Sequence, residues 1–156
     1  MLKITIVAMG NKMPRWVLDA TDDYLKRLTD GVSVSIIEIP LLKRNKGTSL
    51  HKILDQERLL MQSKIPQQAK IIALDKSGNM LSSEGLADKI KHLMPCSSHL
   101  CYLIGGPEGI HPALLEQCHE RWSLSALTFP HTIARIIVIE TLYRAWSILN
   151  NHPYHK

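Results

Sequence analysis

The sequence has few of the features that mark secreted, membrane-bound or fibrous proteins. Its 156 residues include only three cysteines, an odd number that argues against a disulfide framework and suits a reducing cytosol. The longest apolar stretches, such as residues 133–139, are interrupted by Arg135 and fall short of the ~20 residues that a membrane-spanning helix needs. No sustained period indicates a coiled coil, collagen or a repeat array. We therefore expect a cytoplasmic protein without a membrane partner.

A signal peptide is not expected either, because residues 1–8 alternate between apolar and polar side chains and form no apolar h-region. With 45% hydrophobic and 21% charged residues, the composition is that of a globular chain and not of a disordered one. A chain of this length can bury one core, so we predict a single domain over residues 1–156. The net charge of +5 permits a polyanionic partner without demanding one.

Residue spacing gives little support to metal or covalent chemistry. Cys96 and Cys101 are five positions apart, Cys118 is adjacent to His119, and His111 precedes His119 by eight, so no pair has a usual zinc spacing. No G-x-S-x-G elbow occurs, and Cys118 on a predicted helix is typical of a small buried side chain. The sequence therefore predicts neither a metal site nor a covalent nucleophile.

Strand-like and helix-like segments alternate, which predicts an α/β fold with a mostly parallel sheet flanked by helices. The expected strands are residues 2–8, 32–39, 71–74, 100–104 and 122–126, with a turn at 75–79. Helices are expected at residues 14–30, after the caps Thr48 and Ser49, after Ser82 or Ser83, and at 111–120 and 130–149. Functional residues of such sheets lie at the carboxyl ends of the strands, so the loops of interest are 74–79, 105–111 and 125–131.

The segment Gly105–Gly109 is the most distinctive local feature, because glycines at a strand end let a ligand approach the backbone closely. It is neither a dinucleotide fingerprint nor a P-loop, and Pro107 lacks the amide that a phosphate cradle would use. A neutral or cationic ligand fits this segment better than a phosphate. A tight turn without a ligand is the alternative interpretation.

A basic loop at residues 43–52 contains no acid, since none occurs between positions 38 and 55. The pattern predicts a mobile loop that contacts phosphate, and a solvated surface loop is an equally good interpretation. Its cations are Lys43, Arg44, Lys46 and Lys52.

The final helix carries an apolar band, from Ile133 to Ile148, that is wider than one sheet contact needs. Either a second subunit covers the extra surface, or the helix is central and packed on several sides within one chain. Arg135, Glu140 and Arg144 interrupt the band, and each must pair or face a site because unpaired buried charge is costly.

Four motifs occur in order: LIGGPEG at 103–109, SLSALTFPH at 123–131, LYRAWSI at 142–148 and HPYH at 152–155. Together they resemble the RlmH family of SPOUT methyltransferases. The similarity extends to VAMGNKMPRWV at 7–17 and EIPLLKR at 38–44, so it covers nearly the whole chain.

This resemblance implies a C-terminal trefoil knot, a homodimer, and S-adenosylmethionine as cofactor. It also implies methylation of N3 of a pseudouridine in a hairpin of 23S rRNA within the assembled ribosome. The cofactor contacts carried over by motif are Leu74, Gly105, Leu124, Ser125, Ala126, Leu127, Thr128 and Phe129.

By the same resemblance, Arg144, Tyr154 and His155 are the candidate catalytic residues, holding the base and assisting loss of its proton. A frayed terminus is the alternative for the tail. The chain ends with Lys156 where close relatives tend to have arginine, which weakens the case for a bidentate phosphate contact there. Two other functions remain open: a non-enzymatic RNA-binding or ribosome-assembly module, and a SPOUT enzyme that acts on tRNA.

Overall fold

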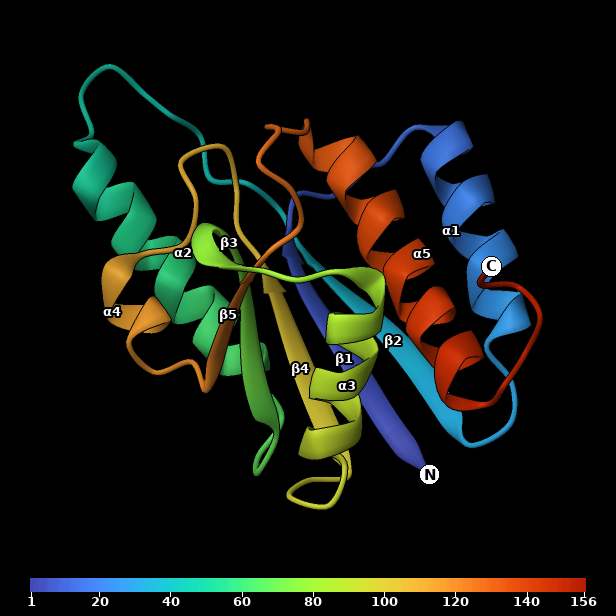
Figure 1. The fold of residues 1–156 in the computed structure, drawn as a ribbon. Helices are drawn as coiled ribbons and strands as arrows, with labels where there is room; N and C mark the ends of the chain where they lie inside the picture. Colours follow the sequence, from blue (N-terminus) through green and yellow to red (C-terminus); the bar gives the residue numbers. More distant parts are fainter.

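Five parallel strands form one sheet in the order β2-β1-β4-β3-β5 in the computed structural model, which describes residues 1–156 (Figure 1). The strands are β1 (Leu2–Met9), β2 (Val32–Ile39), β3 (Lys70–Met80), β4 (His99–Ile104) and β5 (Glu120–Ser123). The helices are α1 (Arg15–Arg27), α2 (Leu50–Lys64), α3 (Ser83–Leu93), α4 (Pro112–Leu115) and α5 (His131–Leu149). The predicted α/β fold with a parallel sheet is confirmed.

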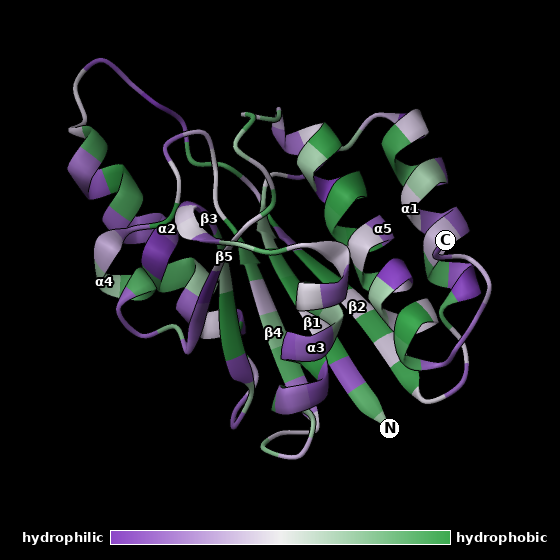
Figure 2. Cartoon of the chain, in the orientation of Figure 1, coloured by the Kyte–Doolittle hydropathy of each residue, from purple (hydrophilic) through white to green (hydrophobic).

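Helices cover both faces of the sheet (Figure 1). One face packs against α1, α3 and α5 around Tyr102, Trp122 and Ile139, and the other packs against α2 and α4 around Met61 and Leu114. Figure 2 shows hydrophobic residues along the central strands and on the helix sides that face them. Coverage on both faces explains why the inner strands are nearly continuous apolar runs in the sequence.

Local sequence accounts for where the helices begin. The side chains of Ser49 and Ser82 accept hydrogen bonds from amides of the first turns of α2 and α3, at 3.3 and 3.0 Å. Pro14 and Pro130 occupy the residue just before α1 and α5, where no amide donor is required. These helix starts agree with the sequence-based boundaries.

Several predicted boundaries are wrong, including the end of α1, which stops at Arg27 and not at residue 30, and the start of β5, which is Glu120 and not residue 122. β5 ends at Ser123 instead of continuing to residue 126, and α4 stops at Leu115 although a helix was expected to residue 120. β3 runs on to Met80 through residues 75–79, which were predicted to form a turn. A short helix and a short edge strand leave more of this region to loops, so tertiary contacts decide its conformation.

The extension of β3 depends on Gly78. The ladder between β3 and β5 is irregular, because Trp122 pairs with Leu74 and again with Asn79. A Cβ atom on Gly78 would lie 2.6 Å from the carbonyl carbon of Arg121, so only glycine permits so close an approach to β5. A single glycine thus lets the strand resume its pairing after the bulge.

The segment between β3 and α3 crosses over the chain that leaves β5 for α5 (Figure 1). A C-terminal knot requires such a crossing, because the end of the chain must pass beneath an earlier loop. The knot itself stays a prediction from the resemblance.

Helix α5 lies between α1 and α3 on the sheet (Figure 1). Its three charged residues are all paired within the chain: Arg135 binds Glu38, and Arg144 binds Glu140 at 2.6 Å. Packing on several sides therefore accounts for much of the wide apolar band, as the second interpretation proposed. No helix of the chain has the length and apolar character needed to span a bilayer.

Candidate cofactor and catalytic site

The carboxyl end of β4 lies beside Leu74 in the middle of β3, and the carboxyl ends of β3 and β5 pair with each other. Ile104 is the ladder partner of Leu74, and Leu74 is in turn a partner of Trp122. Gly105 therefore leaves β4 directly beside Leu74, and Leu124 follows β5 two residues after Trp122. The structure thus brings together residues from the three segments that the sequence predicts to carry the site, although residues 74–79 belong to β3 and do not form a loop.

A pocket of about 110 Å³ lies at this edge, between the sheet, α3 and α5. Leu74 and Leu124 of the predicted cofactor residues line it. None of the lining side chains is charged, so the pocket suits an uncharged heterocycle or sugar and not a phosphate. The remaining lining residues are Leu81, Ser82, Ser83, Leu86, Tyr102, Trp122, Ser123, Val138, Thr141 and Leu142.

One pocket residue, Tyr102, has a buried hydroxyl without a hydrogen-bond partner. By contrast, the hydroxyls of Ser123 and Thr141 donate to backbone carbonyls at 3.0 and 2.8 Å. Burial raises the pKa of the Tyr102 phenol, so the group stays protonated at neutral pH. The mostly apolar, uncharged walls fit the chemistry of an adenine ring, although a cavity of about 110 Å³ holds only part of S-adenosylmethionine.

Replacing Tyr102 by phenylalanine is expected to stabilise the unliganded protein by about 1 kcal/mol, because the substitution removes a buried polar group that has no partner. Urea unfolding of both proteins without ligand measures this difference. A less stable phenylalanine variant would contradict the prediction and show that a partner, such as bound water, already satisfies the hydroxyl.

The other predicted cofactor residues form an exposed turn directly after Leu124. The Ser125 hydroxyl accepts a hydrogen bond from the Leu127 amide at 3.0 Å, which shapes the turn. Ala126, Leu127 and Thr128 are exposed, while Phe129 is half-buried. These residues do not line the pocket, but their exposed backbone can supply donors and acceptors to a ligand edge.

Gly105 is a glycine for a different reason from the predicted one. A Cβ atom there would lie 2.7 Å from the carbonyl carbon of Gly109 and 2.8 Å from a side-chain carbon of Ile110. The Gly109 amide also donates to the Gly106 carbonyl at 3.0 Å. The turn closes on itself, so the absence of a side chain at 105 permits this closure, and the cofactor contact of Gly105 stays a prediction.

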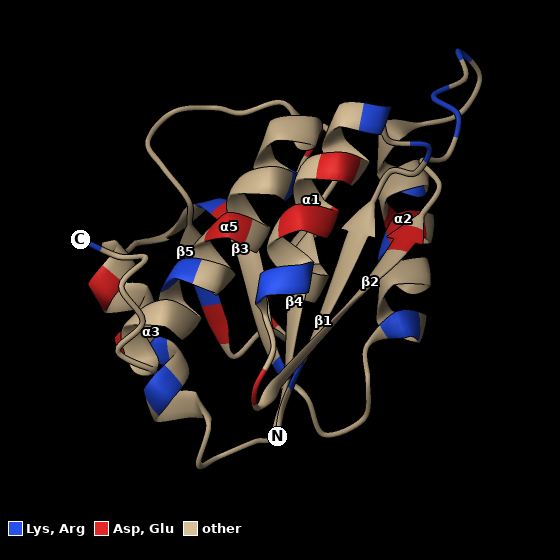
Figure 3. Cartoon of the chain, turned by 90° about the vertical axis from the view of Figure 1, so that its right-hand side faces the viewer, with Lys and Arg blue, Asp and Glu red and all other residues tan.

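The basic loop is divided between free and engaged cations. Lys43 and Lys46 are exposed, and Figure 3 shows basic residues on the protruding loop between β2 and α2. Arg44 instead binds Glu57 and Glu108, both at 2.7 Å. The expectation that Arg44 belongs to a set of phosphate-binding cations is therefore not supported by its contacts.

The C-terminal tail folds back on α5, where Arg144, Tyr154 and His155 form one cluster. The Tyr154 hydroxyl donates to Glu140 at 2.9 Å, and the Arg144 guanidinium lies 4.8 Å from the centre of the Tyr154 ring. Burial, aided by hydrogen bonds with Tyr24 and Glu140, raises the pKa of Tyr154, which keeps it a phenol at neutral pH. In this structure the tail is docked and not frayed.

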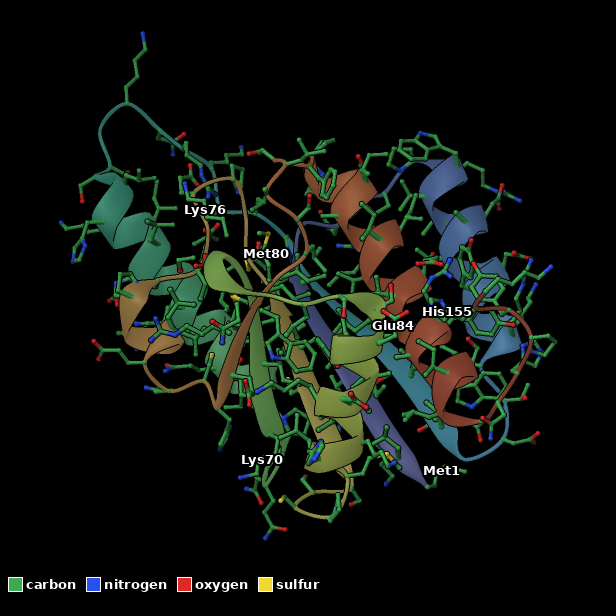
Figure 4. The ribbon with its side chains drawn as sticks, in the orientation of Figure 1. Met1, Lys70, Lys76, Met80, Glu84 and His155 are labelled. Carbon is green, nitrogen blue, oxygen red and sulfur yellow. The ribbon has the colours of Figure 1, made fainter.

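Both ring nitrogens of His155 are engaged. Nε2 lies 2.8 Å from Glu84 on α3, and Nδ1 lies 3.1 Å from the Arg144 guanidinium. Figure 4 shows Glu84 and His155 next to each other between α3 and the tail. Because a guanidinium only donates, Nδ1 must be the acceptor and Nε2–H donates to Glu84. His155 can therefore take up a proton at Nδ1 only after Arg144 has turned to another partner.

The two carboxylates that the catalytic candidates contact are next in sequence to residues that line the pocket. Glu84 directly follows Ser83, and Glu140 directly precedes Thr141, and both Ser83 and Thr141 line the pocket. Sequence reasoning did not identify Glu84 as a partner, because an acid in the first turn of a helix is commonplace. It also missed Tyr102, which looks like an ordinary residue of a buried strand.

The thiols of Cys101, which is buried, and Cys118, which is half-buried, are poor nucleophiles. Burial raises the pKa of Cys101 to about 12 and that of Cys118 to about 11. Thiolates are therefore scarce at neutral pH at both positions.

Comparisons with known proteins bear on the family of this chain. A family profile described as predicted SPOUT methyltransferase matches residues 2–155. The ribosomal RNA large subunit methyltransferase H of Legionella pneumophila (strain Paris) is 56% identical over 156 residues, the whole of both chains. Proteins with that name from Saccharophagus degradans and Coxiella burnetii are 42% and 41% identical over 155 residues, covering 99% of this chain and all of each relative.

A solved structure, described as a probable methylase family protein from Haemophilus influenzae Rd KW20, aligns with a TM-score of 0.55. The alignment covers all of this chain and 72% of the other, and at 14% identity it shows a shared fold alone. The family profile matches nearly the whole chain, and the relatives are similar to it along their full length. The chain belongs to the SPOUT family of methyltransferases.

Proposed function

We propose that this protein transfers the methyl group of S-adenosylmethionine to N3 of a pseudouridine in the 23S rRNA of the assembled ribosome. The observation that carries the proposal is the juxtaposition of two sites. An uncharged pocket at three strand ends lies beside a cluster of Arg144, Tyr154 and His155. The names of the full-length relatives, which describe large-subunit rRNA methyltransferases, support the same substrate class.

When bound, the cofactor supplies an electrophilic methyl group on a sulfonium. Methyl transfer would replace the N3–H bond of the base by an N3–CH₃ bond, with the S–CH₃ bond of the bound cofactor broken and the proton taken up by a side chain or water. The protein holds N3 of the base in line with the methyl group and helps to remove the proton, so this alignment accounts for much of the rate enhancement. Pocket residues such as Leu74 and Leu124 orient the adenosine, and exposed backbone of residues 125–129 meets its polar edge.

Arg144 and His155 have separate roles at the base, charge stabilisation and proton uptake. The Arg144 guanidinium stabilises negative charge on a base carbonyl oxygen as N3 loses its proton. When Arg144 turns toward that oxygen, Nδ1 of His155 becomes free to take the proton, directly or through water. Glu84 continues to accept the hydrogen bond from His155 Nε2–H and so stabilises the imidazolium that forms.

The substrate RNA meets the basic loop. Lys43 and Lys46 are exposed, and a modest positive net charge favours a polyanion without requiring a separate RNA-binding domain. The reaction takes place in the cytoplasm, where ribosomes are assembled, and the proposal assigns no role to a metal.

Methyl incorporation into purified ribosomes that lack the modification tests the proposal. We expect transfer to the 23S rRNA of these ribosomes and none to tRNA, together with S-adenosylmethionine binding in isothermal titration. Cofactor binding with transfer to tRNA alone would favour the tRNA enzyme. Absence of cofactor binding would favour the non-enzymatic RNA-binding module.

We also propose that the protein is a homodimer, joined partly through α5 and the residues beside it. Trp16 at the start of α1 is 51% exposed and Leu127 before α5 is 71% exposed, so large apolar side chains remain uncovered at neighbouring helix starts. Light scattering at low micromolar concentration should give twice the 17.7 kDa chain mass. A mass of one chain under these conditions would contradict the dimer.

A further inference from the structure

Arg44 uses its whole guanidinium within the protein. It donates to both oxygens of Glu57 at 2.7 and 3.0 Å, and to the Leu42 carbonyl at 2.6 Å. It also donates to both oxygens of Glu108, at 2.7 and 3.4 Å. These five hydrogen bonds equal the five N–H groups that arginine possesses, so none is left for an RNA phosphate.

The contact with Glu57 is the fixed half of this arrangement. Glu57 on α2 is only 4% exposed, and the Leu42 amide also donates to it, at 3.2 Å. A buried carboxylate is costly without a charged partner, so Arg44 cannot leave Glu57 without destabilising the fold. Arg44 is therefore anchored to α2, although it lies at the base of an exposed basic loop.

The contact with Glu108 joins this anchor to the glycine turn of the site. Glu108 lies within Gly105–Gly109, and the hydrogen bond from Arg44 is the largest cause that lowers the pKa of this carboxyl. Leu41 makes a second contact, since a Cβ atom on Gly106 would lie 3.0 Å from its methyl group. Because the turn is closed so tightly on itself, holding Glu108 fixes the position of Gly105 as well.

We propose that Arg44 is a positioning residue of the cofactor site, which holds the turn Gly105–Gly109 in its binding shape through Glu108. The inference rests on the proposed function only in taking this turn as part of the cofactor site. Arg44 touches neither cofactor nor RNA, and its effect on binding passes through the turn. Its neighbour Lys43, which is exposed and without an ion pair, has the separate task of meeting the RNA.

Isothermal titration with S-adenosylmethionine tests this role in three variants. Glu108→Gln keeps the Arg44–Glu57 pair and so should remain folded, yet it weakens a charge-assisted contact, and we expect the cofactor Kd to rise about tenfold. Arg44→Met should show a similar rise. Because Arg44→Met leaves Glu57 unpaired, the double variant Arg44→Met/Glu57→Gln is included as a second form that keeps no buried charge.

Two readouts separate positioning from a general loss of structure. The triple variant that combines Arg44→Met/Glu57→Gln with Glu108→Gln should have nearly the same cofactor Kd as the double variant or Glu108→Gln alone. Both sets of changes interrupt the same contact, that between Arg44 and Glu108, so their effects should not add. Lys46→Ala is the matched control, an exposed cation of the same loop, and should raise the KM for ribosomes while leaving the cofactor Kd unchanged. Thermal unfolding of each variant checks that the fold is retained.

The proposal is overturned if folded Glu108 and Arg44 variants bind the cofactor as tightly as the unmodified protein. It is also overturned if Arg44→Met/Glu57→Gln raises only the KM for ribosomes, which would make Arg44 an RNA contact. Failure of the proposed function has a different signature, because the unmodified protein would then not bind S-adenosylmethionine at all.

Discussion

Deleting residues 154–156, or replacing Arg144 by alanine, is expected to reduce methyl transfer by about 100-fold or more, the range typical for loss of an acid–base or charge-stabilising group. The affinity for S-adenosylmethionine should stay within a few-fold. We expect the cofactor affinity to be kept because the tail contacts Glu140 and Glu84 but does not line the pocket. Methyl incorporation into unmodified ribosomes and isothermal titration on the same preparations measure both quantities.

The tail also covers apolar surface, so folding must be controlled. The Tyr154 ring packs 4.6 Å from that of Tyr143, and its deletion uncovers part of α5. His155→Gln is a gentler second variant that keeps a hydrogen-bonding side chain, and removal of Lys156 alone is the matched control at an exposed position. Circular dichroism reports on the fold.

Two outcomes would contradict the catalytic role of the tail. Full turnover after the deletion would show that other groups or solvent activate the pseudouridine. Loss of cofactor binding in step with activity would show that the tail closes the pocket, and the assignment of His155 would then be wrong.

Replacing Gly105 by valine is expected to abolish S-adenosylmethionine binding while the protein remains folded. The Cβ atom would lie 2.7 Å from the Gly109 carbonyl carbon, a distance that real Cβ atoms do not tolerate, so the turn has to open. Gly105 does not line the pocket, but it directly follows Ile104, which pairs with the pocket residue Leu74, so the displacement occurs one residue from that pair. Isothermal titration measures binding, and thermal unfolding measures the fold.

Gly47→Ala is the matched control for that substitution. Gly47 lies in the exposed basic loop, and a Cβ atom there has no heavy atom within 4 Å. The control should bind the cofactor as the unmodified protein does. A folded Gly105→Val variant with unchanged affinity would remove this turn from the cofactor site.

Local patterns in the sequence were sufficient for most of the secondary structure. β2 was predicted residue for residue because β-branched residues fill it and Pro40 ends it. The starts of α2 and α3 were predicted because serine hydroxyls satisfy amides that every helix leaves free. Such signals act over a few residues, so they can be recognised without knowledge of the rest of the chain.

The sequence by itself also determined which loops matter. In a parallel sheet all carboxyl strand ends lie on one edge, so the loops after β3, β4 and β5 had to gather there. The resemblance to the family added residue assignments, which stay predictions, and the structure places Leu74 on β3 beside the end of β4 that precedes Gly105, with Leu124 just after β5.

Only the tertiary structure decided the partners of individual side chains. Gly78 looked like a turn residue, but it lets β3 press against β5 and resume pairing, which depends on a strand more than forty positions later. Arg44 looked like a free cation because the acids that bind it, Glu57 and Glu108, lie 13 and 64 positions away. Propensities and spacing describe neighbours along the chain, whereas close approach and charge pairing depend on neighbours in space.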